Sequence, residues 1–230
     1  MIIDLSLSNL LSYSIVLINT NRLYFIGNNM ENVLVIESSV RFNDSISREL
    51  TGILTDKIKA SVSEIIRRDL TKDIHFISEQ SLSAAEKTLE DRTPEDNEYA
   101  SLSDTLIEEL ESADYLIIGA PMYNFGPPAS IKAWADLVAR AKRTFVHTDT
   151  GSVGLLKVKK AFIIAVSGGT GVDSNIDFMT PWLRHFLAFI GITNVEIISA
   201  DGIYRNDGEE KIKLAKEKID SLPELGIKKS

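Results

Sequence analysis

From Asn32 to Ser199, short runs of β-branched and apolar residues alternate with longer stretches whose apolar residues recur at helical spacing. This alternation predicts βα units in which helices bury a parallel sheet on both faces. Strands are expected over residues 32–38, 73–77, 115–120, 160–166 and 194–199. The pattern therefore predicts an α/β fold with a doubly wound, five-stranded parallel sheet.

Helices are expected in the gaps between these strands. The first spans residues 45–68, where Ile46, Leu50 and Leu54 begin an apolar stripe at helical spacing. The next begins at Thr93-Pro94-Glu95-Asp96, because threonine caps a helix, proline suits its first position and acids favour the positive end of its dipole. The remaining helices are predicted over residues 129–140, 181–190 and 208–219.

Composition excludes several classes of function. The formal net charge of −8 argues against a surface that binds nucleic acid or an anionic membrane, because such surfaces are basic. The chain has no cysteine, so redox chemistry would require a bound cofactor. None of the histidines, His75, His147 and His185, has a His or Cys neighbour at metal-ligand spacing, and no transition-metal site is expected.

Residues 1–29 differ from the rest, since they are rich in Leu, Ile, Ser and Asn and carry only Asp4 and Arg22 as charges. Polar residues interrupt the apolar run too early for a signal peptide, and the apolar stretches are too short to span a membrane. The first strand begins directly after Met30. We therefore expect residues 1–29 to be an extension that is not native, followed by one domain over residues 30–230.

The loop after the first strand, Ser38-Ser-Val-Arg-Phe-Asn-Asp-Ser-Ile-Ser47, lacks the three glycines of a dinucleotide-binding Rossmann turn. It offers hydroxyls at Ser39, Ser45 and Ser47 and ends at a helix N-terminus, where free N–H groups bind anions. One interpretation is a phosphate site. The alternative is that Ser45 only caps its helix and the other hydroxyls contact solvent.

The loop after the third strand, Ala120-Pro-Met-Tyr-Asn-Phe-Gly-Pro-Pro128, contains two aromatic residues, an amide and three prolines. It follows the strand where a doubly wound sheet places a ligand. A stiff wall of this composition can hold an aromatic ring by its edge and stack on its face. The alternative is an apolar turn packed under the next helix.

The loop after the fourth strand, Val166-Ser-Gly-Gly-Thr-Gly171, is rich in glycine. Glycines allow a ligand close to the backbone, whose N–H groups stabilise negative charge. Alone, this loop is more typical of a tight turn. The three loops follow the C-terminal ends of three parallel strands. Together they offer phosphate donors, an aromatic wall and a glycine-rich edge, a combination that fits flavin mononucleotide (FMN).

From Met30 to about Gly202 the chain resembles the FMN-dependent NADH-azoreductases, also described as NADH:quinone oxidoreductases, of the flavodoxin-like superfamily. The resemblance rests on Pro121-Met-Tyr-Asn-Phe125, on residues 131–141 and on Phe189-Ile-Gly-Ile192. It implies the strand order 2-1-3-4-5. It assigns the phosphate to Ser39, Ser45, Ile46 and Ser47, the isoalloxazine ring to Met122, Tyr123, Asn124 and Phe125, and its pyrimidine edge to Val166, Ser167, Gly168 and Gly169.

The resemblance also implies a cytoplasmic homodimer in which Phe189 approaches the partner's flavin. It implies ping-pong transfer of two electrons from NADH or NADPH to a quinone or an aromatic azo compound. The chain departs from the family at two places: His147 stands where the family has tyrosine, and Ser167-Gly168-Gly169-Thr170 replaces a Ser-Arg-Gly-Gly-type run. Both departures are expected near the acceptor, so they concern the choice of acceptor and not FMN binding. No acid or base in the protein is obligatory, and His147 is a candidate proton donor. The alternatives are a flavodoxin-like electron carrier and a catalytically silent interaction module.

Overall fold

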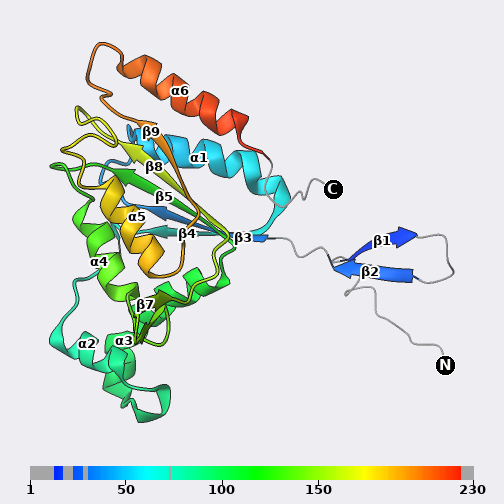
Figure 1. Ribbon diagram of the computed structural model, residues 1–230, viewed down its shortest axis with the longest axis vertical. Helices are drawn as coiled ribbons and strands as arrows, with labels where there is room; N and C mark the ends of the chain where they lie inside the picture. The colour runs from blue at the N-terminus through cyan, green and yellow to red at the C-terminus, as the bar shows by residue number, and fades with distance from the viewer. Residues whose placement is uncertain (1–12, 18–22, 28–30, 73, 224–230) are drawn as a thin grey trace.

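A parallel sheet of five strands lies at the centre of the molecule (Figure 1). The computed structural model describes residues 13–17, 23–27, 31–72 and 74–223. The strands of the sheet are β3 (Glu31–Glu37), β4 (Val62–Asp69), β5 (Tyr115–Pro121), β8 (Lys160–Val166) and β9 (Val195–Ala200). Their spatial order is β4-β3-β5-β8-β9, which is 2-1-3-4-5 when only these strands are counted along the chain. The predicted fold class, an α/β fold with a five-stranded parallel sheet, is confirmed.

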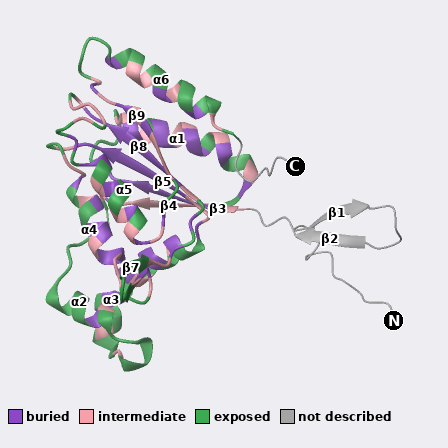
Figure 2. Cartoon of the chain, viewed as in Figure 1, coloured by how far each residue is buried: buried purple, intermediate pink, exposed green. Residues whose placement is uncertain are grey.

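Helices cover both faces of this sheet (Figures 1 and 2). One face carries α1 (Ile46–Ile58) and α6 (Gly208–Ser221), and the other carries α3 (Pro94–Ser112), α4 (Ala129–Val138) and α5 (Thr180–Phe189). Alternate side chains of β3 divide between the two cores: Val33 packs on the α1 side, whereas Leu34 packs on the side of Trp134. This alternation follows from the two-residue period of a strand, and explains why its apolar run is continuous.

The second strand and the end of the first helix were predicted wrongly. Helix α1 ends at Ile58, and a 3₁₀ turn, η2 (Lys59–Ser61), leads into β4. Val62 and Ile65 continue the helical spacing of α1. A pattern of so few apolar residues does not distinguish the end of a helix from an edge strand. Their β-branched side chains favour the strand. Of the segment 73–77, residue 73 lies outside the described residues and 74–77 form no strand, with Phe76 76% exposed.

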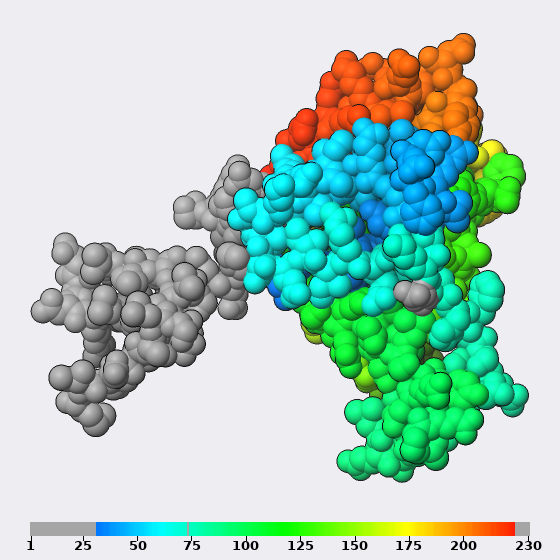
Figure 3. Space-filling view, turned by 180° about the vertical axis from the view of Figure 1, so that it is seen from behind, coloured from blue at the N-terminus to red at the C-terminus, as the bar shows by residue number. Residues whose placement is uncertain are grey.

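The remaining predicted elements lie within about two residues of their expected bounds at most termini. Helix α3 begins as expected, with Thr93 and Asp96 forming a reciprocal capping box. The unpredicted elements are α2 (Glu79–Glu86), η3 (Leu89–Asp91), the hairpin of β6 (Phe145–Thr148) and β7 (Gly151–Gly154), and the hairpin of β1 (Tyr13–Leu17) and β2 (Leu23–Gly27). Seen from behind, α6 lies along α1, and the α2–α3 region projects at the other end (Figure 3).

Candidate functional site

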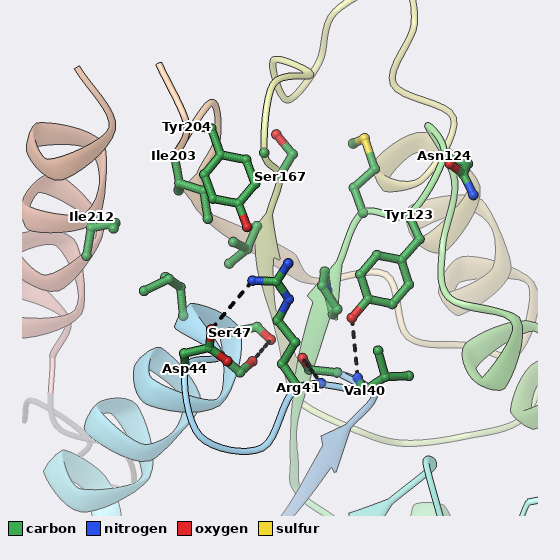
Figure 4. Close-up of a pocket in the computed structure, with 17 residues that line it drawn as sticks. Val40, Arg41, Asp44, Ser47, Tyr123, Asn124, Ser167, Ile203, Tyr204 and Ile212 are labelled. Carbon is green, nitrogen blue, oxygen red and sulfur yellow. Dashed lines mark hydrogen bonds and ion pairs between the residues drawn. The ribbon is translucent and has the colours of Figure 1, made fainter. Parts of the chain in front are cut away.

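The carboxyl ends of β3, β5 and β8 meet at one edge of the sheet, where the three loops singled out by sequence border an open cleft (Figure 4). The cleft has a volume of about 780 Å³. It is lined by Ser39, Val40, Arg41, Asp44, Ser45, Ile46, Ser47, Pro121, Met122, Tyr123, Asn124, Val166, Ser167, Gly168, Ile203, Tyr204 and Ile212. The structure thus brings together every predicted cofactor-binding residue except Phe125 and Gly169, which directly follow lining residues.

The first loop presents donors at the N-terminus of α1. Ser45 is the N-cap, and its hydroxyl accepts from the N–H of Arg48 at 3.4 Å and lies 3.2 Å from the hydroxyl of Ser47. Capping therefore accounts for part of the role of Ser45. Within the described chain the N–H groups of Ile46 and Ser47 have no protein acceptor. Together with the hydroxyls and the helix dipole, they suit an anion.

Arg48 shapes this loop, and sequence reasoning missed it. Its guanidinium donates to the carbonyl of Ser39 at 2.7 Å and to that of Arg41 at 3.1 Å. It also donates to the Asp69 carboxylate at 3.0 Å. Burial raises the pKa of Asp69, but the hydrogen bonds from Arg48 and Thr71 outweigh it and lower that pKa. The available signal was a cation in the first turn of a helix, where the dipole disfavours it unless an anion is near.

Arg41 is the only basic side chain among the described residues that line the cleft. Its guanidinium lies 3.7 Å from the carboxylate of Asp44, and the two side chains are 53% and 76% exposed. So exposed a pair contributes little to stability. The charge of Arg41 is therefore available to a ligand in the cleft.

The second loop is a tight turn held at both ends. Tyr123 and Gly126 exchange backbone hydrogen bonds of 3.0 and 3.1 Å, while Asn124 and Phe125 between them have φ angles of 49° and 71°. A left-handed backbone is uncommon for phenylalanine, and such strain is concentrated at functional sites. The hydroxyl of Tyr123 accepts from the N–H of Val40 at 3.3 Å and so joins the second loop to the first.

The carbonyls of the third loop accept hydrogen bonds from within the protein. The carbonyls of Ser167 and Gly168 accept from the N–H groups of Ile203 and Tyr204, both at 3.0 Å, and the Ser167 hydroxyl donates to the carbonyl of Thr170. In the described part of the chain, no protein group accepts from the N–H of Gly168 or Gly169. This edge of the cleft can therefore donate to a ligand.

A buried carboxyl group lies behind the first two loops, at the end of β3. Glu37 is 7% exposed, and its Oε1 accepts from the Thr51 hydroxyl at 2.5 Å. Its Oε2 has no hydrogen-bond partner among the described residues. A Cβ at Gly119 would lie 2.7 Å from this oxygen, so glycine leaves the room that Glu37 occupies. Burial raises the pKa of Glu37, despite the hydrogen bond from Thr51.

The two remaining candidates, His147 and Phe189, do not line the cleft. His147 lies on β6, and its Nδ1 is 3.1 Å from the Ser152 hydroxyl of β7. The ring of Phe145 connects the two candidates, with its centroid 5.1 Å from that of His147 and 4.5 Å from that of Phe189. They form one aromatic group, separate from the cleft of their own chain.

Sequence reasoning also missed a fourth wall of the cleft. It is formed by Ile203 and Tyr204, which follow β9, and by Ile212 in the second turn of α6. The residues that resemble the azoreductases end near Gly202, just before this wall, so no motif pointed to it. Elsewhere in the described chain, no group of three or more acidic or histidine side chains could hold a metal ion, and no helix could cross a membrane.

Comparison with known families agrees with this arrangement. A family model described as flavodoxin-like fold matches residues 31–222, most of the chain. The chain belongs to this flavodoxin-like family. The matched segment begins at β3 and ends just after α6, so it contains the whole sheet and all four walls of the flavodoxin-like cleft.

Two similar proteins are called FMN-dependent NADH:quinone oxidoreductase. The protein of Erythrobacter litoralis is 45% identical over 84% of this chain and 99% of its own length. That of Pelagibacter ubique is 46% identical over 81% of this chain and 97% of its own length. Among solved structures, an FMN-dependent NADH-azoreductase from Bacillus anthracis in complex with FMN matches with a TM-score of 0.74. It is 27% identical and covers 83% of this chain and 96% of that one.

Proposed function

We propose that this protein is an FMN-dependent NADH:quinone oxidoreductase that also reduces aromatic azo compounds. The observation that carries the proposal is that one cleft has, among the described residues, backbone donors without a protein acceptor at both ends, at Ile46 and Ser47 and at Gly168, with Gly169 directly beside it. Two relatives matched over nearly their whole length are named for the quinone activity, and a solved relative in complex with FMN is named for the azo activity. The matched span supports treating residues 30–230 as one FMN-binding domain.

The phosphate end of the proposed site is the N-terminus of α1. The hydroxyls of Ser39, Ser45 and Ser47 and the N–H groups of Ile46 and Ser47 would bind the FMN phosphate there. Because Arg48 is paired with Asp69, neutral donors supply most of this end. These neutral donors can bind an anion at the helix N-terminus, so the site does not need an unpaired cation buried beside it.

The ring end of the proposed site lies between the second and third loops. Met122 is 8% exposed and, with Tyr123, Asn124 and Phe125, would hold the isoalloxazine ring. Val166, Ser167, Gly168 and Gly169 would line its pyrimidine edge, where donors without a protein acceptor meet its oxygens. N–H groups fixed in this way favour the negative charge of the reduced ring.

When bound, FMN accepts two electrons from NADH and passes them to a quinone or an azo compound. The protein binds the donor and then the acceptor in the same open cleft, which is a ping-pong sequence. The strained turn at Asn124 and Phe125 presents one half-exposed aromatic side chain, that of Phe125, beside this opening. An aromatic acceptor would stack there.

We further propose that the enzyme works as a cytoplasmic homodimer. Phe189 and His147 belong to an aromatic group outside the cleft of their own chain, which suits a role at the partner's site. His147 would donate a proton to the acceptor, with Ser152 fixing the orientation of its ring. Sedimentation should then give twice the mass of the chain.

Steady-state kinetics test this function. NADH oxidation should depend on added FMN and on a quinone, and double-reciprocal plots at several quinone concentrations should be parallel. An aromatic azo dye should replace the quinone. Protein that binds FMN without oxidising NADH would instead be an electron carrier, and protein that does not bind FMN would be neither.

A further inference from the structure

Tyr204 is a large aromatic side chain that is 70% exposed although its backbone is held in a tight turn. Gly202, with φ of 72°, begins this turn, and its carbonyl accepts from the N–H of Arg205 at 2.8 Å. The carbonyl of Arg205 then accepts from Gly208 at the start of α6. Single exposed apolar side chains are common, so the case for Tyr204 rests on its fixed position in the lining of the cleft.

The turn is hydrogen-bonded along the glycine-rich loop of the cleft. Ile203 and Tyr204 donate to the carbonyls of Ser167 and Gly168, and the side chain of Arg205 donates to the carbonyl of Gly169. These bonds join consecutive residues of the two loops in order. The position of Tyr204 is therefore fixed relative to the proposed pyrimidine edge of the site.

The Tyr204 ring lies directly on Gly168. A Cβ at Gly168 would lie 2.8 Å from Cδ2 and 2.9 Å from Cε2 of that ring, too close for any other residue unless the ring moved. The φ angle of Gly168 is not left-handed, so its backbone does not require glycine. What glycine provides here is room for the ring.

Tyr204 and Tyr123 lie on opposite sides of the cleft (Figure 4). Ile203 and Ile212 extend the Tyr204 wall with apolar surface. A planar aromatic ligand between these walls would bury the exposed ring of Tyr204.

We propose that Tyr204, seated on Gly168, is the second aromatic wall of the flavin site and contacts the isoalloxazine of bound FMN. This inference rests on the proposed function. The Tyr204 ring contributes contact area with the isoalloxazine, and its packing against Gly168 fixes the position of the ring. Tyr204 is thus a cofactor-binding residue outside the segment that resembles the azoreductases.

FMN titrated into flavin-free protein, followed by flavin fluorescence, tests this proposal. Tyr204→Leu should weaken the Kd roughly three- to tenfold, the range expected for one aromatic pair. Tyr204→Phe should bind like the native protein, because the ring is retained. The matched control is Tyr99→Leu on α3, which removes a tyrosine 39% exposed outside the cleft and should not change the Kd.

A double-mutant cycle tests the contact between the Tyr204 ring and Gly168. Gly168→Ala keeps the backbone donor but displaces the ring, so it should weaken FMN binding about as much as Tyr204→Leu. The double variant should be no worse than Tyr204→Leu alone. Circular dichroism and urea unfolding of each flavin-free variant show whether the fold is retained.

The outcomes separate this inference from the proposed function. If native protein binds FMN and folded Tyr204→Leu binds it equally well, the inference is wrong and the function stands. If Gly168→Ala weakens FMN binding equally with and without the Tyr204 ring, packing against Gly168 does not position that ring for the flavin. If native protein does not bind FMN, both fail together.

Discussion

The guanidinium of Arg48 donates to the carboxylate of Asp69 at 3.0 Å and thereby joins the first turn of α1 to the end of the edge strand β4. The same guanidinium holds two carbonyls of the first loop. The phosphate end of the cleft is thus built on a link between residues 21 positions apart, one of them on a strand that sequence reasoning misplaced.

Replacing Arg48 should therefore disturb both the fold and the cleft. Arg48→Met leaves the carboxylate of Asp69, which is 20% exposed, without its cation, and we expect a loss of about 1–3 kcal/mol in the free energy of unfolding. Urea unfolding measures this loss. Arg143→Met is the control, since it removes a more exposed ion pair with Glu111 and should cost less than about 1 kcal/mol. Equal losses would contradict the role given to Arg48.

A negative charge at Ser45 should block the phosphate but leave the helix intact. Aspartate is as good an N-cap as serine, so Ser45→Asp should fold normally. Repulsion should weaken FMN binding by more than about tenfold. Riboflavin, which has no phosphate, should bind as it does to native protein. Ser45→Asn is the neutral control with the same capping ability. Equal FMN affinity in the two variants would show that the phosphate does not bind at this loop.

Glu37 should make the fold less stable as pH rises. Burial raises its pKa in the folded protein above the ordinary value of 4.5, so the folded state binds more protons than the unfolded state between those two pKa values. Stability should fall as pH rises through that window, and Glu37→Gln should lack this fall. Urea unfolding without FMN from pH 4 to pH 8 tests this, with Glu64→Gln, at an exposed position of β4, as the control. Parallel curves for native protein and Glu37→Gln would refute it.

His147 should affect the acceptor half of the reaction and not flavin binding. Proton donation by His147 predicts that part of the pH dependence of quinone turnover comes from this side chain. His147→Phe should remove this dependence and leave the FMN affinity unchanged, because His147 lies outside the cleft of its own chain. An identical pH profile in the variant would exclude His147 as the donor.

The sequence predicted the structure correctly where a local pattern was compatible with only one type of element. The run from Ala161 to Val166 is apolar because both faces of β8 are buried, and Thr93 with Asp96 has the spacing of a capping box. Strand β4 lacks such a signal. It is an edge strand with few buried side chains, so its pattern does not separate it from the end of α1.

The candidate site was predictable to the extent that its residues follow consecutive strand ends. Three of its walls are loops whose composition is unusual in itself. The wall with Tyr204 could not be predicted, because its turn becomes part of the cleft only through hydrogen bonds to the third loop. Arg48 was missed for a similar reason, since its partner Asp69 is distant in the sequence.

The measurement that tests the central claim most directly is the absorbance spectrum of protein reconstituted with FMN and freed of excess flavin. Flavin bands should remain with the protein, bleach when NADH is added without oxygen, and return when a quinone follows. Bands that ignore NADH would contradict the reductase assignment, and the absence of bands after reconstitution would contradict the flavin site itself.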